Sequence, residues 1–436
     1  MRPTPRALFV AAAGLGLAVL PALGLPASWF GWALYWALFA AALVVDASRT
    51  PRRRDLEIEL DVPELLYVGA VGAGTLRLRS TARGGRTEVT ARVDLSHHLA
   101  PGPALRGILG EGTLALALPL GAERRGTAEI AAAWVRVAGP LGLCARVHRV
   151  PLARTLAVVP NLPHVRGHAL AFWGARDLAA GLKIERFLGD GSEFDSLCEF
   201  MPGFDRRSVD WKASARHTKL LARQYRAERS HQIVLAVDTG RLMAEPLLGL
   251  PRLDHAVHAA LQLGLVSVRA GDRVGLFAFD ERPRRLLAPR AGMGAFRLML
   301  AASSELAYSN AETNFTLGLT SLMASLSRRS LVIVLTDFVD TVSAELVFDN
   351  LLRLSRRHLC VFAALRDPVL DAEATREPTR PRDLHRAIVA DSLAQERELV
   401  LRRLSRHGIG CIDAAPGELG SALCNRYLEI KRRELV

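Results

Sequence analysis

Two long uncharged apolar runs at the N-terminus constrain this chain more than any other feature. Residues 7–25 and 29–45 contain no charged side chain, and the break between them reads Pro26-Ala27-Ser28. Each run is about long enough, at the lower end of the range, to cross a bilayer as a helix. The sequence therefore predicts a transmembrane helical hairpin over residues 1–50.

Charged and aromatic residues beside the two runs indicate the orientation of this hairpin. Arginines flank its outer ends: Arg2, Arg6, Arg49, Arg52, Arg53 and Arg54. The positive-inside rule places such flanks in the cytoplasm. The second run begins with aromatic residues, as a belt at the outer interface would: Trp29, Trp32, Tyr35 and Trp36. We expect a multi-pass protein of the cell inner membrane, with two helices and cytoplasmic soluble domains.

A rival interpretation is a cleaved signal peptide, because Leu25-Pro26-Ala27 resembles a processing site. Cleavage would leave residues 29–45 as a single anchor. The arginines that follow would still hold the body of the protein on the cytoplasmic side.

The formal net charge of +13 invites a nucleic-acid interpretation. The arginines are dispersed, however, and no basic run is interleaved with aromatic residues, so we expect no nucleic-acid partner and assign the charge to solvated surface and to attraction for anionic lipid. The five cysteines are widely spaced and form no CxxC pattern. They indicate reduced thiols in a cytoplasmic compartment.

Short alternating segments follow the membrane runs. Apolar and polar residues alternate over residues 56–60, 75–79, 88–93 and 113–116, with Gly and Pro between them. This period of two is typical of half-buried antiparallel strands. We predict a small β-sandwich domain over residues 55–155, with a spacer or packing role preferred to a binding role.

From residue 229 to residue 436 the pattern changes to alternating strands and helices. Short apolar runs predict buried strands at 232–238, 273–279, 331–337, 359–365 and 408–414. Helical spacing is found at 253–268, 315–326, 344–354 and 384–405. The fold class is therefore predicted as α/β, with a doubly wound parallel sheet whose ligands bind beyond the carboxyl ends of the strands.

The segment at 185–228, between the two domains, carries the most distinctive residue pattern. Ser192 is predicted to cap a short helix that Pro202-Gly203 ends, and Ser208 a second helix that carries Trp211. Charges of both signs lie close together, which favours an ion-pair network with a structural role: Asp205, Arg207, Asp210, Lys212 and Arg216.

This segment resembles the bacterial family known as domain of unknown function 58. The matching residues, in order, are Gly189, Glu193, Phe194, Pro202, Gly203, Asp205, Arg207, Asp210, Trp211, Lys212, Ala215 and Arg216, followed by a strand that ends at Asp238. Phe204 and Cys198 depart from the family pattern. The resemblance implies two membrane helices, a β-domain and a von Willebrand A-like domain, and it implies a MoxR-type AAA ATPase as partner.

Von Willebrand A domains often bind a divalent cation through a D-x-S-x-S loop, a threonine and a further aspartate. The matching positions here are Asp238, Thr313 and Asp337, but Gly240 and Leu242 replace the two serines. Because Mg²⁺ readily keeps several waters, the resemblance implies a weakened Mg²⁺ site at the three remaining residues. The alternative is that the two aspartates cap the loops and helices that follow them.

No motif of a nucleophile elbow, a P-loop, a zinc protease or a dinucleotide site is present in the sequence. We therefore expect no enzyme, but a membrane-anchored interaction or adaptor protein that binds the ATPase or its client in protein complex assembly. The alternatives are a metal-dependent hydrolase that uses the same strand-end acids and a purely structural scaffold.

Overall fold

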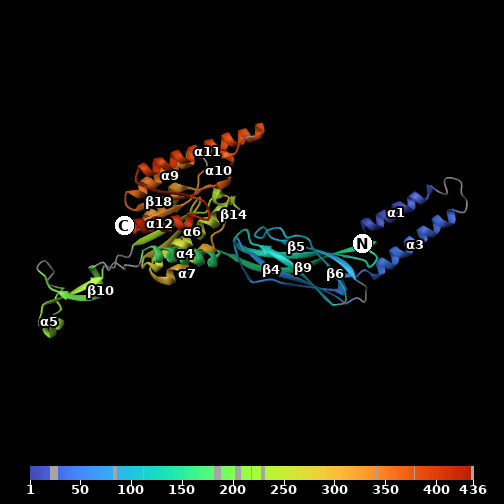
Figure 1. Ribbon diagram of the computed structural model, residues 1–436, viewed down its shortest axis with the longest axis horizontal. Helices are drawn as coiled ribbons and strands as arrows, with labels where there is room; N and C mark the ends of the chain where they lie inside the picture. Colours follow the sequence, from blue (N-terminus) through green and yellow to red (C-terminus); the bar gives the residue numbers. More distant parts are fainter. Residues whose placement is uncertain are drawn as a thin grey trace. The chain divides into compact units, whose positions relative to one another are not determined.

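The computed structural model describes residues 1–19, 28–81, 86–110, 112–180, 188–201, 208–217, 219–226, 231–338, 341–377 and 379–433. It divides into two compact units, Met1–Asn161 and Leu162–Val436 (Figure 1). Helices and β-sheets occur in both units. The mixed α/β class is therefore confirmed.

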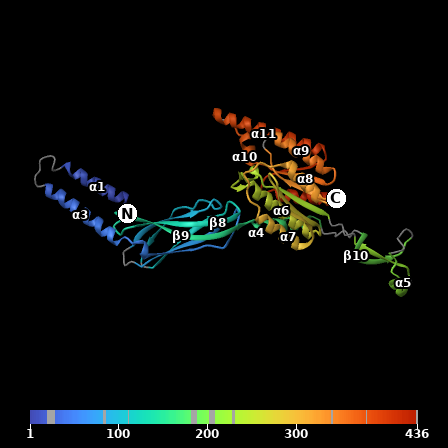
Figure 2. The same cartoon turned by 180° about the vertical axis from the view of Figure 1, so that it is seen from behind.

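The N-terminal apolar runs form two helices that lie side by side in both views, α1 (Pro5–Leu17) and α3 (Ser28–Arg49) (Figures 1 and 2). Trp32 Nε1 of α3 donates a hydrogen bond to the carbonyl oxygen of Gly14, 3.1 Å away. A β-carbon at Gly14 would lie only 2.3 Å from the Tyr35 ring. Glycine at this position therefore permits the close approach of the two helices.

One of these helices is long enough to cross a membrane. The helix Trp29–Arg49 has 21 residues, is mostly apolar and is little buried, and it spans roughly 30 Å at the helical rise. This confirms one long apolar helix near the N-terminus, as a membrane anchor requires. The 13 residues of α1 are shorter than a full span, so the two-span hairpin stays a prediction. The turn between the runs, with the processing site at Leu25-Pro26-Ala27, lies outside the described residues.

A buried carboxylate joins α3 to the β-domain that follows it. Asp46, in the last turn of α3, is fully buried. Its two oxygens accept hydrogen bonds from the backbone N–H groups of Leu141, Leu143 and Cys144 at 2.7 to 2.8 Å. All three amides belong to the turn between β8 (Gly126–Ala138) and β9 (Cys144–Val159) or to the first residue of β9.

The β-domain has two sheets. The smaller is antiparallel, in the order β2 (Leu56–Asp61), β4 (Val71–Ser80), β7 (Thr113–Gly121). The larger has the order β1 (Arg2–Pro3), β9, β8, β5 (Thr87–Leu95), β6 (Leu105–Leu109), with β3 (Leu65–Tyr67) paired parallel to β9. The four predicted strands are present, and burial alternates along them as the sequence indicated. A short 3₁₀ turn, η1 (Arg53–Asp55), precedes β2.

The second unit is built on a six-stranded sheet. Its five predicted strands are parallel, and the sixth, β16, is an antiparallel edge strand. The order across the sheet is β16 (Pro283–Arg290), β15 (Arg273–Phe279), β12 (Gln232–Asp238), β17 (Leu331–Leu335), β18 (Leu359–Leu365) and β19 (Gly410–Ala414). The predicted strands at 331–337 and 408–414 were each two residues too long.

Helices cover both faces of this sheet. On β12, Ile233, Leu235 and Val237 join one buried cluster, whereas Val234 and Ala236 join the other. The first cluster is covered by α4 (Leu162–Ala180), α6 (Arg252–Arg269), α7 (Gly292–Ser304) and α12 (Leu419–Arg432). The second is covered by α8 (Phe315–Ser325), α9 (Thr341–Ser355) and α11 (Pro381–Arg406), and α10 (Pro368–Thr375) packs on α11. The von Willebrand A-like assignment of this arrangement stays a prediction.

The sequence pattern missed β16 and the helices α4, α7, α10 and α12. β16 begins at Pro283 and is largely exposed at the sheet edge, so it lacks the apolar run of the other strands. The unpredicted 3₁₀ turn η3 (Arg241–Ala244) and the strand pair β13 (Pro246–Leu247) and β14 (Leu250–Pro251) lie between β12 and α6.

The short helix predicted after Ser192 is wrong. Gly189, Glu193 and Phe194 lie in a strand, β10 (Leu188–Glu199), that pairs antiparallel with β11 (Leu221–Arg226). A helix of about one turn is unstable by itself, because its nucleation costs more free energy than its few hydrogen bonds return. The same residues as a strand gain backbone hydrogen bonds to β11. Pro202, Gly203, Asp205 and Arg207 lie outside the described residues.

The second predicted helix is present as α5 (Trp211–His217), but its capping residue is Asp210 rather than Ser208. Asp210 Oδ1 accepts the N–H of Ala213 at 3.0 Å, and Oδ2 accepts from Arg223 Nε at 2.8 Å. These bonds lower the pKa of Asp210. Lys212, Ala215 and Arg216 are exposed, and Trp211 is 72% exposed.

Candidate functional site

The strand-end acids meet at the carboxyl edge of the six-stranded sheet, as predicted. Asp238 is the last residue of β12, and Asp337 follows β17 by two positions. These neighbouring strands flank the point at which strand order reverses, because β15 lies on one side of β12 and β17 on the other. Ligands of open α/β sheets bind at this kind of position.

Asp238 is 1% exposed, and three protein donors engage its carboxylate. Oδ1 accepts from the backbone N–H of Gly240 at 2.8 Å and from the Thr313 hydroxyl at 2.7 Å, while Oδ2 accepts from the Thr336 hydroxyl at 2.6 Å. Burial raises the pKa of Asp238 to about 6 despite these bonds. The structure therefore brings the predicted pair Asp238 and Thr313 together.

The raised pKa of Asp238 predicts a pH-dependent stability. The native state binds more protons than the unfolded chain between the ordinary pKa of 3.8 and the native pKa of about 6. Stability should therefore fall as pH rises through this window, and a cost of about 3 kcal/mol is fully present above it. Asp238→Asn cannot ionise, so its melting temperature relative to wild type should increase from about pH 4 to about pH 6 and then level off.

Thermal unfolding of the full chain in detergent across this pH range measures that difference. The matched control is Asp349→Asn, which removes an exposed carboxylate on α9. A difference between Asp238→Asn and wild type that does not vary with pH would contradict the interpretation.

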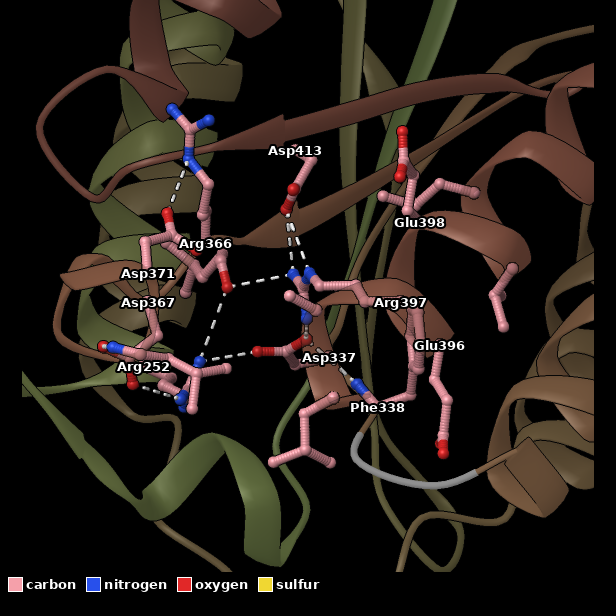
Figure 3. A pocket seen from close by; sticks show the side chains of 16 residues that line it. Arg252, Asp337, Phe338, Arg366, Asp367, Asp371, Glu396, Arg397, Glu398 and Asp413 are labelled. Carbon is pink, nitrogen blue, oxygen red and sulfur yellow. Dashed lines mark hydrogen bonds and ion pairs between the residues drawn. The ribbon is translucent and has the colours of Figure 1, made fainter. Parts of the chain in front are cut away.

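Asp337 lies between two arginines (Figure 3), whereas the Thr313 hydroxyl donates to Asp238. Arg252 Nη1, at the start of α6, is 2.6 Å from Oδ2, and Arg397 Nη1, on α11, is 2.6 Å from Oδ1. The side chains of Asp337, Arg252 and Arg397 are only 4%, 13% and 17% exposed. This is a largely buried ion-pair cluster, not a carboxylate facing solvent.

Two outer carboxylates complete the cluster. Arg252 Nη2 is 3.3 Å from Asp367 Oδ2, and Arg397 Nη2 is 2.9 Å from Asp413 Oδ1. The carbonyl oxygen of Leu365 accepts from Arg397 Nη2 at 3.0 Å. Burial alone would lower the pKa of Arg397, but Asp337 and Asp413 outweigh it and raise that pKa. We call these five residues, Asp337, Arg252, Arg397, Asp367 and Asp413, the arginine cluster.

A pocket of about 300 Å³ opens beside the arginine cluster (Figure 3). It is lined by charged residues and by apolar residues of α10 and α11, such as Leu370 and Leu393. Among the described residues, its lining contains six acids and three arginines, and no hydroxyl, thiol, imidazole or amine side chain. This composition can hold a partner through charge and apolar contact.

The residues do not fit the implied Mg²⁺ site in this arrangement. Every carboxylate oxygen of Asp238 and Asp337 accepts a hydrogen bond from a protein group. A β-carbon at Gly240 would lie 2.0 Å from Thr313 Oγ1, so the space of the missing serine is filled. Two guanidinium groups beside Asp337 would repel a cation. Within the described ranges, no group of three or more His, Cys, Asp or Glu residues could hold a metal ion.

The sequence analysis missed the other four members of the arginine cluster. Asp367 follows β18 by two positions, as Asp337 follows β17, so a search for acids just beyond the strand ends could have found it. Asp413 is the charged residue in an otherwise apolar strand. A charge in such a position is usually paired with an opposite charge, so the pattern indicates an ion pair. Arg252 and Arg397 carry no local signal, because their partners come from distant elements.

Residues 196–375 match the family model described as "Protein of unknown function DUF58". Residues 196–375 therefore resemble the DUF58 family, which confirms the resemblance for the segment at 185–228 from residue 196 onward. Gly189, Glu193 and Phe194 lie before the match. The match includes Asp238, Arg252, Asp337 and Asp367, whereas Arg397 and Asp413 lie beyond its end. The arginine cluster thus joins the matched segment to the chain that follows it.

Two curated proteins that are similar to this chain have names that assign no function. The uncharacterized protein Rv1480 of Mycobacterium tuberculosis and the uncharacterized protein Mb1516 of Mycobacterium bovis are each 25% identical over 212 residues, which is 48% of this chain. The chain spans 62% of the length of these relatives.

Solved structures show only distant likeness. The conserved hypothetical protein BatB of Bacteroides thetaiotaomicron is 16% identical, with a TM-score of 0.31, over 48% of this chain and 100% of its own. An uncharacterized membrane spanning protein of Vibrio fischeri is 17% identical, with a TM-score of 0.17, over 47% of this chain and 100% of its own. These TM-scores carry no conclusion about function.

Proposed function

We propose that this chain is a membrane-anchored interaction protein that docks a partner at the carboxyl edge of its six-stranded sheet. One observation carries the proposal: the described residues that line the pocket at that edge are acids, arginines and apolar side chains, and several of the charged ones form ion pairs with one another. Such a lining can recognise a partner by charge and shape. The parallel sheet with helices on both faces supports a von Willebrand A-like, doubly wound assignment.

The membrane part of the proposal has two helices in a hairpin, with the soluble units in the cytoplasm. The contact between α1 and α3 supports a hairpin, because Trp32 bonds to the Gly14 carbonyl. Arginines at both outer ends support the cytoplasmic orientation. The anchor would hold the docking edge on the side of the membrane where ATP is available.

The partner we propose is a MoxR-type AAA ATPase or its client, in protein complex assembly. The support is the match to the DUF58 family over residues 196–375, because the resemblance to this family implies a MoxR-type AAA ATPase as partner. The relatives' printed names assign no partner. The other alternative is a purely structural scaffold, in which the pocket binds no partner.

A hydrolase that uses the strand-end acids is the second candidate, without the Mg²⁺ that the resemblance implied, because Asp238 and Asp337 do not fit a cation in this arrangement. One observation favours it: burial raises the pKa of Asp238 to about 6, which suits a general acid. Turnover assays on purified full chain, with Asp238→Ala as the test variant, separate this candidate from the first. A rate that disappears in Asp238→Ala but not in a variant of the pocket rim would favour the hydrolase.

A pull-down tests the docking proposal. Full chain in detergent is mixed with a purified MoxR-type ATPase from the same genome, and bound ATPase is quantified for wild type and Glu396→Lys. Glu396 lines the pocket and is exposed, so reversal of its charge should weaken binding about tenfold without unfolding the domain. Glu129→Lys, the same change at an exposed position of β8, is the matched control.

Two outcomes would overturn the docking proposal. Absence of ATPase binding by wild type removes this class of partner. Equal binding by wild type and Glu396→Lys removes the pocket as its site.

Mg²⁺ should not stabilise the chain. Because protein donors occupy the oxygens of Asp238 and Asp337, the melting temperature of the full chain in detergent should be the same in Mg²⁺, in chelator, and in NaCl of equal ionic strength. A cation that binds only the native state must raise that temperature. A saturable rise that is lost in Asp238→Ala would restore the predicted metal site.

A further inference from the structure

A second pocket, of about 240 Å³, lies in the first unit beside the start of α1. It is lined by residues of α1, of strands β5 and β8, and of the turn that follows β8: Thr4, Pro5, Arg6, Glu88, Thr90, Arg136, Ala138 and Gly142. The docking proposal makes no use of it.

Hydrogen bonds fix this pocket relative to the membrane anchor. The Thr4 hydroxyl donates to the carbonyl of Gly142, and the Thr4 N–H donates to the carbonyl of Leu143 at 2.9 Å. Asp46, in the last turn of α3, accepts three N–H groups around the same turn. The pocket therefore lies level with the first turn of α1 and the last turn of α3, where the ends of membrane helices meet lipid headgroups.

The pocket carries uncompensated positive charge. Arg6 and Arg136 are exposed, and within the part of the chain that the structure describes neither has a carboxylate in ion-pair range. A β-carbon at Gly142 would lie 3.1 Å from Arg6 Nη1, which places that guanidinium at the wall of the pocket. With Glu88 as the one acidic group, the lining has a net charge of +1 from two arginines and one glutamate.

We propose that this pocket binds the phosphate of an anionic phospholipid headgroup, with phosphatidylglycerol as the chemical type. Arg6 and Arg136 donate to the phosphate oxygens, because guanidinium groups match phosphate geometry with paired N–H donors. The Thr90 hydroxyl, half-buried on β5, supplies a further donor. Glu88 accepts from a hydroxyl of the headgroup, and the net charge of +1 matches one phosphodiester. The inference rests on the proposed membrane anchoring, but not on the docking of an ATPase.

Native mass spectrometry of the full chain, released from detergent, tests the proposal. The probes are phosphatidylglycerol, phosphatidylcholine, and inorganic phosphate alone. Wild type should retain one phosphatidylglycerol in preference to phosphatidylcholine, and Arg136→Gln and Arg6→Gln should each weaken that retention about tenfold. Arg154→Gln is the control, because Arg154 is an exposed arginine of β9 in the same sheet, ten residues from the Cys144 end.

Each contrary outcome overturns the proposal in a different way. Equal retention by wild type and both pocket variants removes the site. Equal retention of the two lipids removes the selectivity for an anionic headgroup. Inorganic phosphate that binds alone and displaces the lipid shows a free-phosphate site instead. Glu396→Lys should retain lipid like wild type, so failure of ATPase docking and failure of lipid binding are separate results.

Discussion

Replacement of Asp337 by alanine should destabilise the second unit by about 3–5 kcal/mol. Asp337 is the carboxylate shared by Arg252 and Arg397, at 2.6 Å from each. Its removal leaves two largely buried guanidinium groups without their shared carboxylate. Breaking a buried ion pair lowers the free energy of unfolding far more than breaking an exposed one. The melting temperature of this unit should fall by roughly 10 °C, and hydrogen exchange of the β17 and β18 amides should accelerate.

The matched control for Asp337→Ala is Glu398→Ala on α11. Glu398 lies 2.6 Å from Arg402, but the two side chains are 60% and 65% exposed. Loss of this pair should cost no more than about 0.5 kcal/mol. Similar losses in Asp337→Ala and Glu398→Ala would show that the arginine cluster is solvated in the native protein.

The second large effect is expected at Asp46. Asp46→Ala removes the acceptor of three backbone N–H groups, from Leu141, Leu143 and Cys144. A buried donor left unsatisfied costs about 1–3 kcal/mol. Because Leu141 is exposed and Leu143 and Cys144 are half-buried, water can reach part of these N–H groups, and the junction between α3 and the β-domain should lose about 1–3 kcal/mol in total. Hydrogen exchange of these amides is the direct measurement, since their protection should fall while that of central β8 amides persists.

Two further variants show whether the effect at Asp46 comes from its hydrogen bonds or from its charge. Asp46→Asn keeps one acceptor oxygen and should lose less protection than Asp46→Ala. Asp61→Ala removes an exposed carboxylate, which is 67% exposed and 3.4 Å from Arg77, and should leave the three amides unchanged. Unchanged protection in Asp46→Ala would mean that water replaces the carboxylate at the junction.

The central strands were predictable because burial on both faces leaves a strong local signal. The run at 232–238 is apolar at nearly every position, and β12 has those bounds in the structure. β16 could not be predicted in this way, since an edge strand needs no continuous apolar run and Pro283 and Pro289 interrupt it.

The segment at 188–199 shows how a distant partner overrides a local pattern. Ser192 followed by Asp195 is typical of a helix start, yet β10 pairs with β11, whose residues follow by more than twenty positions. Distant partners also limited how much of the candidate site could be predicted. Asp238 and Thr313 meet as the resemblance implied, whereas the arginines of Asp337 come from α6 and α11 and carry no sequence pattern of their own.

The bonds of Thr4 and Asp46 have a mechanical consequence. The start of α1 and the end of α3 both attach to one turn, the turn between β8 and β9, so hydrogen bonds hold both helix ends directly against that turn. In the proposed membrane anchor, a tilt of the helices in the bilayer would move the turn with them, and β8 and β9, which pair along most of their length, would carry the movement into the β-domain. A change in bilayer thickness would then reach the β-domain as a rotation.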